Sequence, residues 1–591
     1  MMLSSAQRSL ALRLLIGLAQ GGALWLLHDR SATKLWPATE VETFRALVSV
    51  ALVVPAIAIA GIDNLRLRTL LVWAAVAAMI CAGLGFYAGY REAPPDVSLP
   101  SWFFSSFWSS FTPVLAVLFF IGHSLAVAAD ADRRPVAGFP TYFDVSWRHA
   151  TQLALAAVFV GLFWLILWLG AEMFRLIRIE FFATVIAKAW FWIPATTVAA
   201  SAAFHLTDTS VGIVRGTRAL VLNLLAWLLP ILVLIGAGFL TALPFTGLQP
   251  LWATRFATGS LLIATVALIL LINAHFQDGG PDTNRNPVLL YARLAAALLI
   301  APLIVLATVG LGLRVEQYGW TPSRIVALAW IVVIACHSVG YLAAALRSAT
   351  GLVYLPVTNV LSAFVMVAVL IALLTPIADP ARLSVASQVA RLESGKVTPD
   401  KFDFYFLKSG SARYGWEALG RLKDKKDGPN AQQIAEKAAA VAKSPSLWDT
   451  LLISPPSATP ATRVANIKMM RPDSVVLPAA FLGEDWNRFK GNPQLPGCLT
   501  AERRTCEGLL LDLTGDGTPE ILLFESGQAT VFTKDAQGKW SFVGRINRLS
   551  CNAALDAIRS GKFDVVPPAF KDIEANGVRL QVTTDCPPQR R

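Results

Sequence analysis

Four side chains that carry oxygen atoms lie near the C-terminus at spacings of two, two and four residues: Asp512, Thr514, Asp516 and Glu520. Calcium is a hard cation that binds several oxygen ligands, and alternate positions of a tight loop direct such ligands inward. Gly517 permits the sharp turn that this geometry needs. The segment therefore predicts a calcium loop between two apolar strands, and a metal-free strand-turn-strand built on Asp-Gly chemistry is the alternative.

The same loop resembles the calcium-binding loops of integrin-type propeller repeats, which run Asp-x-Asp/Asn-x-Asp-Gly-x-x-Asp/Glu. Asp512, Asp516 and Glu520 match that pattern, whereas Thr514 replaces the second carboxylate and should weaken calcium binding. The loop is not an EF-hand, because its twelfth position is Leu523. The motif occurs in one copy, which excludes a propeller.

Four of the six cysteines, Cys498, Cys506, Cys551 and Cys586, fall within the last 94 residues. An even set of cysteines in one small domain indicates two disulfides and an oxidising compartment. Pairing in order, Cys498 with Cys506 and Cys551 with Cys586, is one of three possible connectivities. The other two cysteines lie in apolar segments and are interpreted as small apolar fillers.

Five polar side chains lie within or at the ends of apolar segments and are candidates for an intramembrane function: Glu172, His123, His337, Asn223 and Asn359. Ionisable groups inside a bilayer are costly and are functional suspects by default. Glu172 is interpreted as half of an interfacial ion pair with an arginine at position 175 or 178, and both histidines as hydrogen-bonded packing residues. No carboxylate lies at the centre of an apolar segment, which argues against an ion-driven pump.

Several enzyme classes are excluded by missing residues. All six histidines lie in the first 376 residues, so the C-terminal region can hold neither a Ser-His-Asp or Cys-His hydrolase nor a zinc site with histidine ligands. The chain contains no Gly-rich phosphate loop of the G-x-x-x-x-G-K-S/T type and no C-x-x-C redox motif. We therefore predict no catalytic residues.

Composition places these residues in a membrane protein. Of the 591 residues 55% are hydrophobic and 15% are charged, against about 25% charged in soluble domains. A membrane span needs about 20 mostly apolar residues. Eleven stretches are candidate spans: 10–27, 44–62, 69–89, 106–129, 151–174, 189–206, 219–241, 257–275, 288–312, 323–346 and 352–376.

The expected fold is a polytopic all-α membrane bundle of about eleven spans, followed by a small soluble α/β C-terminal domain. The bundle covers residues 1–376, a helical juxtamembrane segment covers 377–443, a linker rich in Pro, Ser, Ala and Thr covers 444–473, and the α/β domain with disulfides covers 474–591. Strands are expected at 508–513, 520–525, 529–533, 540–546 and 578–583, and a helix at 552–560.

Charge and span count bear on partners and orientation. The net charge of +12 divides into +7 for residues 1–376 (22 Lys and Arg, 15 Asp and Glu) and +5 for the rest, so no nucleic-acid partner is expected. With the N-terminus inside, cytoplasmic connections carry 12 Lys and Arg and the opposite ones 10, a weak bias. An odd number of spans takes a cytoplasmic N-terminus to an external C-terminus. The clustered cysteines indicate that the C-terminal domain lies in an oxidising compartment. Together they favour a bacterial inner membrane with a periplasmic C-terminal domain.

Several stretches of the chain carry a resemblance to a known family. They are Trp147-Arg-His-Ala, Leu162-Phe-Trp-Leu-Ile-Leu-Trp-Leu, Phe174-Arg-Leu-Ile, Arg382-Leu-Ser, Ser387-Gln-Val-Ala-Arg-Leu, Phe402-Asp-Phe-Tyr-Phe-Leu and Arg413-Tyr-Gly-Trp-Glu-Ala-Leu. Over roughly residues 40–425, but not the last 120, the chain resembles the bacterial multi-span membrane family labelled domain of unknown function 4153. The resemblance supports a membrane protein and offers no reaction and no catalytic residues. We interpret Arg413-Tyr-Gly as packing the first soluble helices against the bundle.

The leading interpretation is a non-enzymatic scaffold or sensor of the cell envelope. Its partners would be the lipid bilayer and a periplasmic or envelope protein, or calcium, bound by the periplasmic domain. An alternative is a transporter or lipid flippase with an uncharged groove lined by Gln20, Asn223, Asn359 and His337.

A second alternative is a membrane-embedded transferase of lipid-linked sugars. Those enzymes resemble one another in a long first external loop that carries catalytic acids. The corresponding loop here, residues 28–43, is short, although it holds Asp29, Glu40 and Glu42. This departure from the pattern argues against a transferase.

Overall fold

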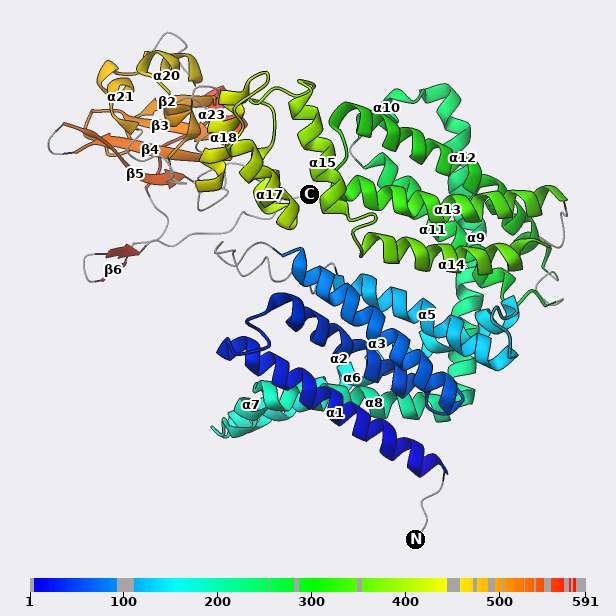
Figure 1. Ribbon diagram of the computed structural model, residues 1–591. Coiled ribbons are helices and arrows are strands. Elements are labelled where there is room, and N and C mark those ends of the chain that lie inside the picture. Colours follow the sequence, from blue (N-terminus) through cyan, green and yellow to red (C-terminus); the bar gives the residue numbers. More distant parts are fainter. Residues whose placement is uncertain are drawn as a thin grey trace. The chain divides into compact units, whose positions relative to one another are not determined.

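The computed structural model is mostly helical and ends in a small region with a five-stranded sheet (Figure 1). It forms two units, Met1–Ala435 and Glu436–Arg591, and each is described by itself. The structure describes residues 5–92, 111–254, 256–280, 286–347, 353–443, 458–470, 476–486, 495–501, 504–525, 527–535, 538–546, 554–567, 573–575 and 578–580.

Within these residues, ten helices of the first unit are long and apolar enough to cross a membrane. They are α1 Ser5–Thr33, α2 Val41–Gly61, α3 Leu67–Tyr90, α5 Thr112–Asp132, α6 Phe139–Leu176, α9 Val211–Thr246, α11 Ala257–Phe276, α12 Pro287–Tyr318, α13 Pro322–Arg347 and α14 Leu355–Leu373. Large apolar side chains such as Ile166 and Leu234 face outward, 68% and 73% exposed, as suits helices that are surrounded by lipid. The predicted multi-pass membrane bundle is confirmed.

The remaining predicted span, 189–206, forms helix α8 Ala189–Thr209, which is not among these ten helices. It lies antiparallel along α1. Near the start of α1, Arg13 contacts His205 of α8, and near its end the ring of His28 lies 6.3 Å from that of Trp192. Between these points a Cβ on Gly21 would come within 2.4 Å of the Pro194 backbone, so the two helices touch closely.

Two short helices interrupt the connections between long ones. Helix α7 Phe181–Ile186 follows α6, and α10 Gln249–Ala253 follows α9. Glycine residues 247 and 319, which end α9 and α12, adopt positive φ angles of 73° and 75°. That conformation is strained for residues with a Cβ, so both glycines mark where the chain can leave a helix.

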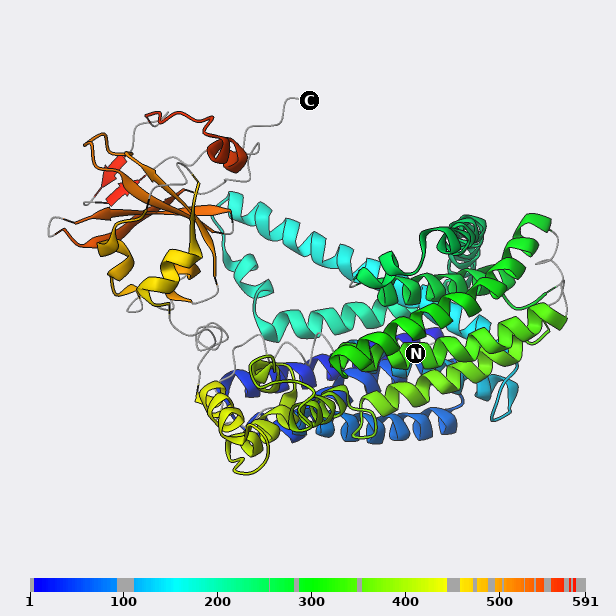
Figure 2. The ribbon, with the colours of Figure 1, turned by 90° about the horizontal axis from the view of Figure 1, so that it is seen from above.

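The two ends of the bundle are distinguished by their contacts, and we name them the N side and the C side. The N side holds the start of α1 and the turn between α2 and α3, where Arg66 pairs with Asp130 at the end of α5 at 2.6 Å. The C side holds Arg91, which follows α3, and Asp379, which follows α14; their side chains pair at 2.6 Å. Helix α1 therefore begins at one end of the bundle, and the chain leaves its last long helix at the other (Figures 1 and 2).

Three helices cover the C side after α14: α15 Pro380–Glu393, α16 Phe404–Ser409 and α17 Ala412–Lys423. Helix α17 turns one apolar face inward and buries Ala418, Leu419 and Leu422. A fourth helix, α18 Ala431–Lys443, lies across the boundary between the two units. This segment is helical, as the sequence predicts for residues 377–443.

The second unit contains a sheet of five strands in sequence order: β1 Ile467–Met469, β2 Cys506–Leu511, β3 Glu520–Glu525, β4 Gln528–Lys534 and β5 Trp540–Ile546. Strands β2 to β5 pair antiparallel, and β1 pairs parallel with β2. Three short helices accompany the sheet: α20 Pro460–Asn466, α21 Ala479–Gly483 and α22 Gly497–Thr500. Helices α21 and α22 contribute to one buried core, in which Phe481 lies 5.1 to 5.3 Å from the rings of Trp486, Phe532 and Trp540.

The described residues of this unit also form helix α23 Ala554–Ser560 and a hairpin of β6 Ile573–Ala575 with β7 Val578–Leu580. The predicted strands and helix all correspond to observed elements. The predicted linker does not hold throughout its length, because residues 460–469 form α20 and β1. A Pro- and Ala-rich composition indicated a linker, yet Thr459 caps a short helix here and the next residues pair with a strand 39 positions later.

Candidate functional site

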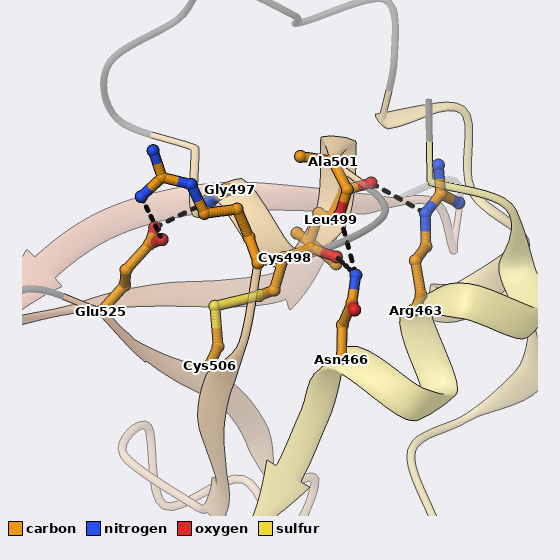
Figure 3. The surroundings of a disulfide bond; sticks show 9 residues. Arg463, Asn466, Gly497, Cys498, Leu499, Ala501, Cys506 and Glu525 are labelled. Atoms are coloured by element: carbon orange, nitrogen blue, oxygen red, sulfur yellow. Dashed lines mark hydrogen bonds and ion pairs between the residues drawn. A yellow bond between two sulfur atoms is a disulfide. The ribbon is translucent and has the colours of Figure 1, made fainter. Parts of the chain in front are cut away.

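The C-terminal unit holds a disulfide between Cys498 and Cys506, whose Cα atoms lie 5.8 Å apart (Figure 3). Both cysteines are buried, Cys498 in the short helix α22 and Cys506 at the start of β2. This is the first bond of the in-order pairing, one of the three connectivities that the sequence left open. The second predicted pair, Cys551 and Cys586, lies outside the described residues.

Buried polar groups hold the disulfide segment in place (Figure 3). Arg463, which is 2% exposed, donates hydrogen bonds to three carbonyl oxygens, those of Leu499 at 2.9 Å, Leu482 at 2.6 Å and Glu484 at 2.8 Å. Burial lowers the pKa of Arg463, yet the carbonyl dipoles solvate its charge. Asn466 donates to two more carbonyls of the segment, at 3.1 and 2.9 Å. The disulfide thus belongs to a well-packed core.

The predicted calcium loop joins β2 to β3, and its carboxylates bind donors of the loop itself. Asp512 accepts hydrogen bonds from the backbone N–H groups of Gly515 at 2.6 Å and Gly517 at 2.9 Å. Glu520, which is buried, accepts one from the Leu513 N–H at 2.6 Å and one from the Thr514 hydroxyl at 3.1 Å. These bonds are those of a tight turn of Asx type.

Asp516 lies at the tip of this loop and accepts a hydrogen bond from the Thr518 N–H at 2.8 Å. Hydrogen bonds from the hydroxyl and backbone of Thr518 lower the pKa of Asp516. Within the described residues, no group of three or more His, Cys, Asp or Glu side chains is arranged to hold a metal ion. Calcium binding by this loop stays a prediction.

The five intramembrane candidates lie on five different helices. Glu172 on α6 pairs with Arg175 at 2.6 Å and both side chains are about half exposed, as in the interfacial ion pair that the sequence suggested. Asn223 is exposed on α9. His123 of α5 is buried and accepts a hydrogen bond from the indole of Trp73 at 3.2 Å.

The structure brings only two of these candidates together, His337 and Asn359, and it does so through Tyr341. The ring of His337 lies edge-on to that of Tyr341, 5.7 Å away. Tyr341 donates a hydrogen bond to Asn359 at 2.6 Å and accepts one from Asn273 at 2.7 Å, and Asn359 donates to Asn273 at 2.6 Å. This closed ring of hydrogen bonds joins α11, α13 and α14 and satisfies its own donors, as packing residues do.

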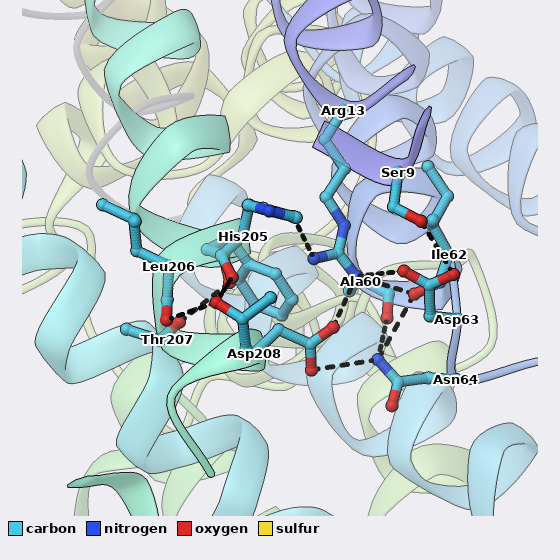
Figure 4. A network of polar contacts seen from close by, with 12 residues as sticks. Ser9, Arg13, Ala60, Ile62, Asp63, Asn64, His205, Leu206, Thr207 and Asp208 are labelled. Carbon is cyan, nitrogen blue, oxygen red and sulfur yellow. Dashed lines mark hydrogen bonds and ion pairs between the residues drawn. The ribbon is translucent and has the colours of Figure 1, made fainter. Parts of the chain in front are cut away.

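A buried ion network on the N side was not foreseen (Figure 4). Arg13 of α1 is fully buried and donates to Asp208 of α8 at 2.5 Å, to the Ile62 carbonyl at 2.7 Å and to His205 at 3.2 Å. Asp208 also accepts a hydrogen bond from Gln152 of α6 at 3.0 Å. An arginine inside a predicted span was the signal in the sequence, because a charge in a span must find a partner.

A second ion network, on the C side, was also missed. Asp379 is fully buried and lies 2.6 Å and 3.1 Å from two guanidinium nitrogens of Arg91. Tyr87 donates to the same carboxylate at 2.6 Å and shares a hydrogen bond of 2.7 Å with Tyr414 of α17. Asp379 also caps α15 by accepting from the Ala381 N–H at 2.8 Å. One carboxylate therefore ties α3, α15 and α17 together.

The segment Arg413-Tyr-Gly has the packing role that the sequence suggested. The Arg413 N–H donates to the Arg91 carbonyl at 2.9 Å, and its guanidinium lies 4.3 Å from the centre of the Tyr90 ring. A Cβ on Gly415 would come within 1.9 Å of the Leu407 carbonyl oxygen, so only glycine fits where α17 crosses α16. The segment joins the outer helices to the end of α3.

Comparison with known proteins places the chain in a family. The family described as domain of unknown function (DUF4153) matches residues 46–422. The chain belongs to this family. The DUF4153 region runs from within α2 to the end of α17. It includes the bundle from α2 onward and the Asp379 network, and it leaves α1 and the disulfide-bonded unit outside. No curated protein and no solved structure matches the chain.

Proposed function

We propose that this DUF4153 protein is a non-enzymatic scaffold or sensor of the bacterial inner membrane, with its C-terminal unit in the periplasm. The observation that carries the proposal is the Cys498–Cys506 disulfide in a buried core. Disulfides form and persist in oxidising compartments such as the periplasm and are rare in the cytosol. The C-terminal unit, which contains no histidine, would bind an envelope protein rather than catalyse a reaction.

The geometry of α8 supports this orientation. Because α8 lies antiparallel along α1 from Arg13 to His28, it covers the same depth as a helix that is apolar enough to cross the membrane. With α8 added to the ten long helices, the described part of the chain has eleven crossings. An odd number of crossings takes a cytoplasmic N-terminus to a periplasmic C side, where α15 begins.

The Asp379 network suggests how a scaffold or sensor would work. It fixes α15 and α17 to the end of α3 through charge and hydrogen bonds, so a force on the outer helices reaches the bundle. A partner bound to the C-terminal unit would act on these helices through the chain that connects them. Two of the residues expected in a transport groove, Asn359 and His337, take part in or adjoin the hydrogen-bonded cluster around Tyr341, which favours a packing role for them over a groove.

Single cysteines on opposite sides of the bundle test the orientation. In a background with Cys81→Ala, Cys336→Ala, Cys551→Ser and Cys586→Ser, we would compare Lys396→Cys, on the exposed turn after α15, with Arg134→Cys, on the exposed turn between α5 and α6. Intact bacterial cells are treated with a membrane-impermeant maleimide, without reductant. We expect Lys396→Cys to react in intact cells and Arg134→Cys to react only after lysis.

The opposite pattern would place the C side in the cytoplasm and contradict the proposal. Labelling of both sites in intact cells would show that the two ends are not on opposite sides, and would contradict the count of eleven crossings. The background protein is the control, because Cys498 and Cys506 are bonded and buried and should not react. Labelling of these cysteines without reductant would remove the observation on which the proposal rests.

A further inference from the structure

A cavity of about 690 Å³ lies between α3, α5, α13 and α14 on the C side of the bundle. This volume is in the range of pockets that hold small molecules. Most of its lining is apolar, from residues such as Val117, Val326, Trp330 and Leu373. The first three of these side chains are 47%, 39% and 46% exposed, so the cavity is open to its surroundings rather than enclosed.

One end of the cavity is polar. Arg91 and Glu92, which directly follow α3, line this end, and the starts of α15 and α17 close it with Pro380, Ala381 and Ala412. This end lies where the long helices stop, at the level expected for lipid headgroups. The cavity thus has the polarity of a phospholipid, with a charged end beside the membrane surface and apolar walls along the helices.

The charges at the polar end are balanced. Arg91 pairs with Asp379, and Glu92 accepts from Arg45 at 2.7 Å. Arg91 keeps 26% of its side chain exposed and Glu92 keeps 16%. A guanidinium carries five N–H donors, and the two oxygens of Asp379 do not use all of them. The polar end therefore offers one cation and one anion to a ligand and has no net charge.

We propose that this cavity binds one zwitterionic phospholipid with a primary ammonium headgroup. Arg91 donates hydrogen bonds to its phosphate, Glu92 accepts from its ammonium group, and one acyl chain lies along Val117, Val326 and Trp330. A purely anionic headgroup would place its charge beside Glu92 without compensation. The buried position of Glu92 raises its pKa, so an added cation beside it is favourable.

The test uses two matched variants of α13. Val326→Trp places an indole in the cavity, whereas Val332→Trp adds the same group about 1.7 turns along α13, at a position that is 45% exposed and does not line the cavity. The full-length protein is reconstituted in phosphatidylcholine vesicles that contain a trace of phosphatidylethanolamine with a photoreactive acyl chain. After irradiation, labelled peptides of α5, α13 and α14 are identified by mass spectrometry.

We expect saturable labelling of these three helices in the wild type. Val326→Trp should lower it about tenfold, which corresponds to about 1.4 kcal/mol. Val332→Trp should keep the labelling within about twofold of the wild-type level. Gel filtration establishes that both variants are folded. Unlabelled phosphatidylethanolamine should compete better than phosphatidylglycerol.

Three results would overturn the proposal. Equal labelling of the two variants would show that the label reports general lipid contact. Stronger competition by phosphatidylglycerol would contradict the assignment of the charges. Crosslinks from these helices to a second copy of the chain, in place of lipid, would assign the cavity to a protein interface. None of these results depends on which side of the membrane the C side faces, so the lipid site and the proposed orientation can fail separately.

Discussion

Replacing Asp379 with asparagine tests whether one carboxylate fastens the outer helices to the bundle. The carboxylate is fully buried. It pairs with Arg91 and accepts hydrogen bonds from Tyr87 and the first N–H groups of α15. Asparagine has nearly the same shape and keeps a carbonyl oxygen that can still cap α15. The substitution therefore removes the charge and changes the shape of the side chain little.

The expected cost follows from the burial of the pair. Removing one partner of a buried ion pair costs about 3–5 kcal/mol, because the other charge is left uncompensated. The Arg91 side chain remains 26% exposed, so water partly solvates its charge. We therefore expect Asp379→Asn to weaken the attachment of α15 and α17 by about 2–3 kcal/mol.

Hydrogen exchange measures this attachment locally, because each segment opens with its own free energy. A loss of about 2–3 kcal/mol corresponds to exchange that is about 30 to 150 times faster. We expect this change in the amides of α15 and α17, while α11 and α12 keep wild-type protection. The full-length protein in detergent or nanodiscs is suitable for the measurement.

Asp424→Asn is the matched control. Asp424 lies at the end of α17, is 75% exposed and pairs with Lys423 only at 3.9 Å. Exposed pairs contribute little, so this variant should exchange like the wild type. Unchanged protection of α15 and α17 in Asp379→Asn would refute the reasoning, and so would an equal loss of protection over the whole bundle.

Three further substitutions test other parts of the molecule. Gly21→Val should lower the thermal midpoint of the detergent-solubilised protein, because a Cβ at this position would lie 2.4 Å from the Pro194 backbone; Gly22→Val, with nothing within 4 Å, should be tolerated. Asp208→Asn should destabilise the bundle by about 3 kcal/mol or more, since its arginine partner is fully buried; a midpoint like that of the wild type would contradict this. Asp512→Ala should speed amide exchange in the β2–β3 loop even in EDTA, because the carboxylate binds backbone N–H groups directly; an effect seen only with calcium would point to a metal site.

Hydropathy predicted the long helices because each is one continuous apolar run. A run of this kind has to satisfy its backbone hydrogen bonds internally when it lies in lipid, which only a helix achieves without partners. Helix α8 shows the limit of this rule. Its residues Thr197, Ser201 and His205 face a neighbour rather than lipid, so its average composition is more polar than that of a lone span.

The strands were predictable for a similar local reason, since alternating apolar residues bounded by Gly and Asp mark strands and turns. Residues 460–469 were misinterpreted as linker, because what orders them is distant. Arg463 and Asn466 bind carbonyls of the 498–501 segment, and β1 gains a partner only when β2 is in place. Composition cannot report such contacts.

The partners within the two ion networks could not be predicted for the same reason. The sequence shows Arg13 and Arg91, but their partners Asp208 and Asp379 lie 195 and 288 residues away. Each carboxylate by itself looks like an ordinary loop residue just beyond a predicted span. Only the packing of the helices brings it against a buried guanidinium.

The positions of these two networks suggest what they do for the fold. Apolar helices in lipid have many interchangeable partners, because their surfaces differ little and the hydrophobic effect does not favour one pairing over another. A buried ion pair adds little net stability, yet it strongly disfavours an arrangement that leaves either charge alone. The pair of Arg13 and Asp208 lies at one end of the bundle and selects α8 as the neighbour of α1. The pair of Arg91 and Asp379 lies at the other end and selects the place where the chain leaves the bundle. We infer that α8, the one predicted span that is not among the ten helices apolar enough to cross a membrane, depends on its charged partner to hold its place beside α1.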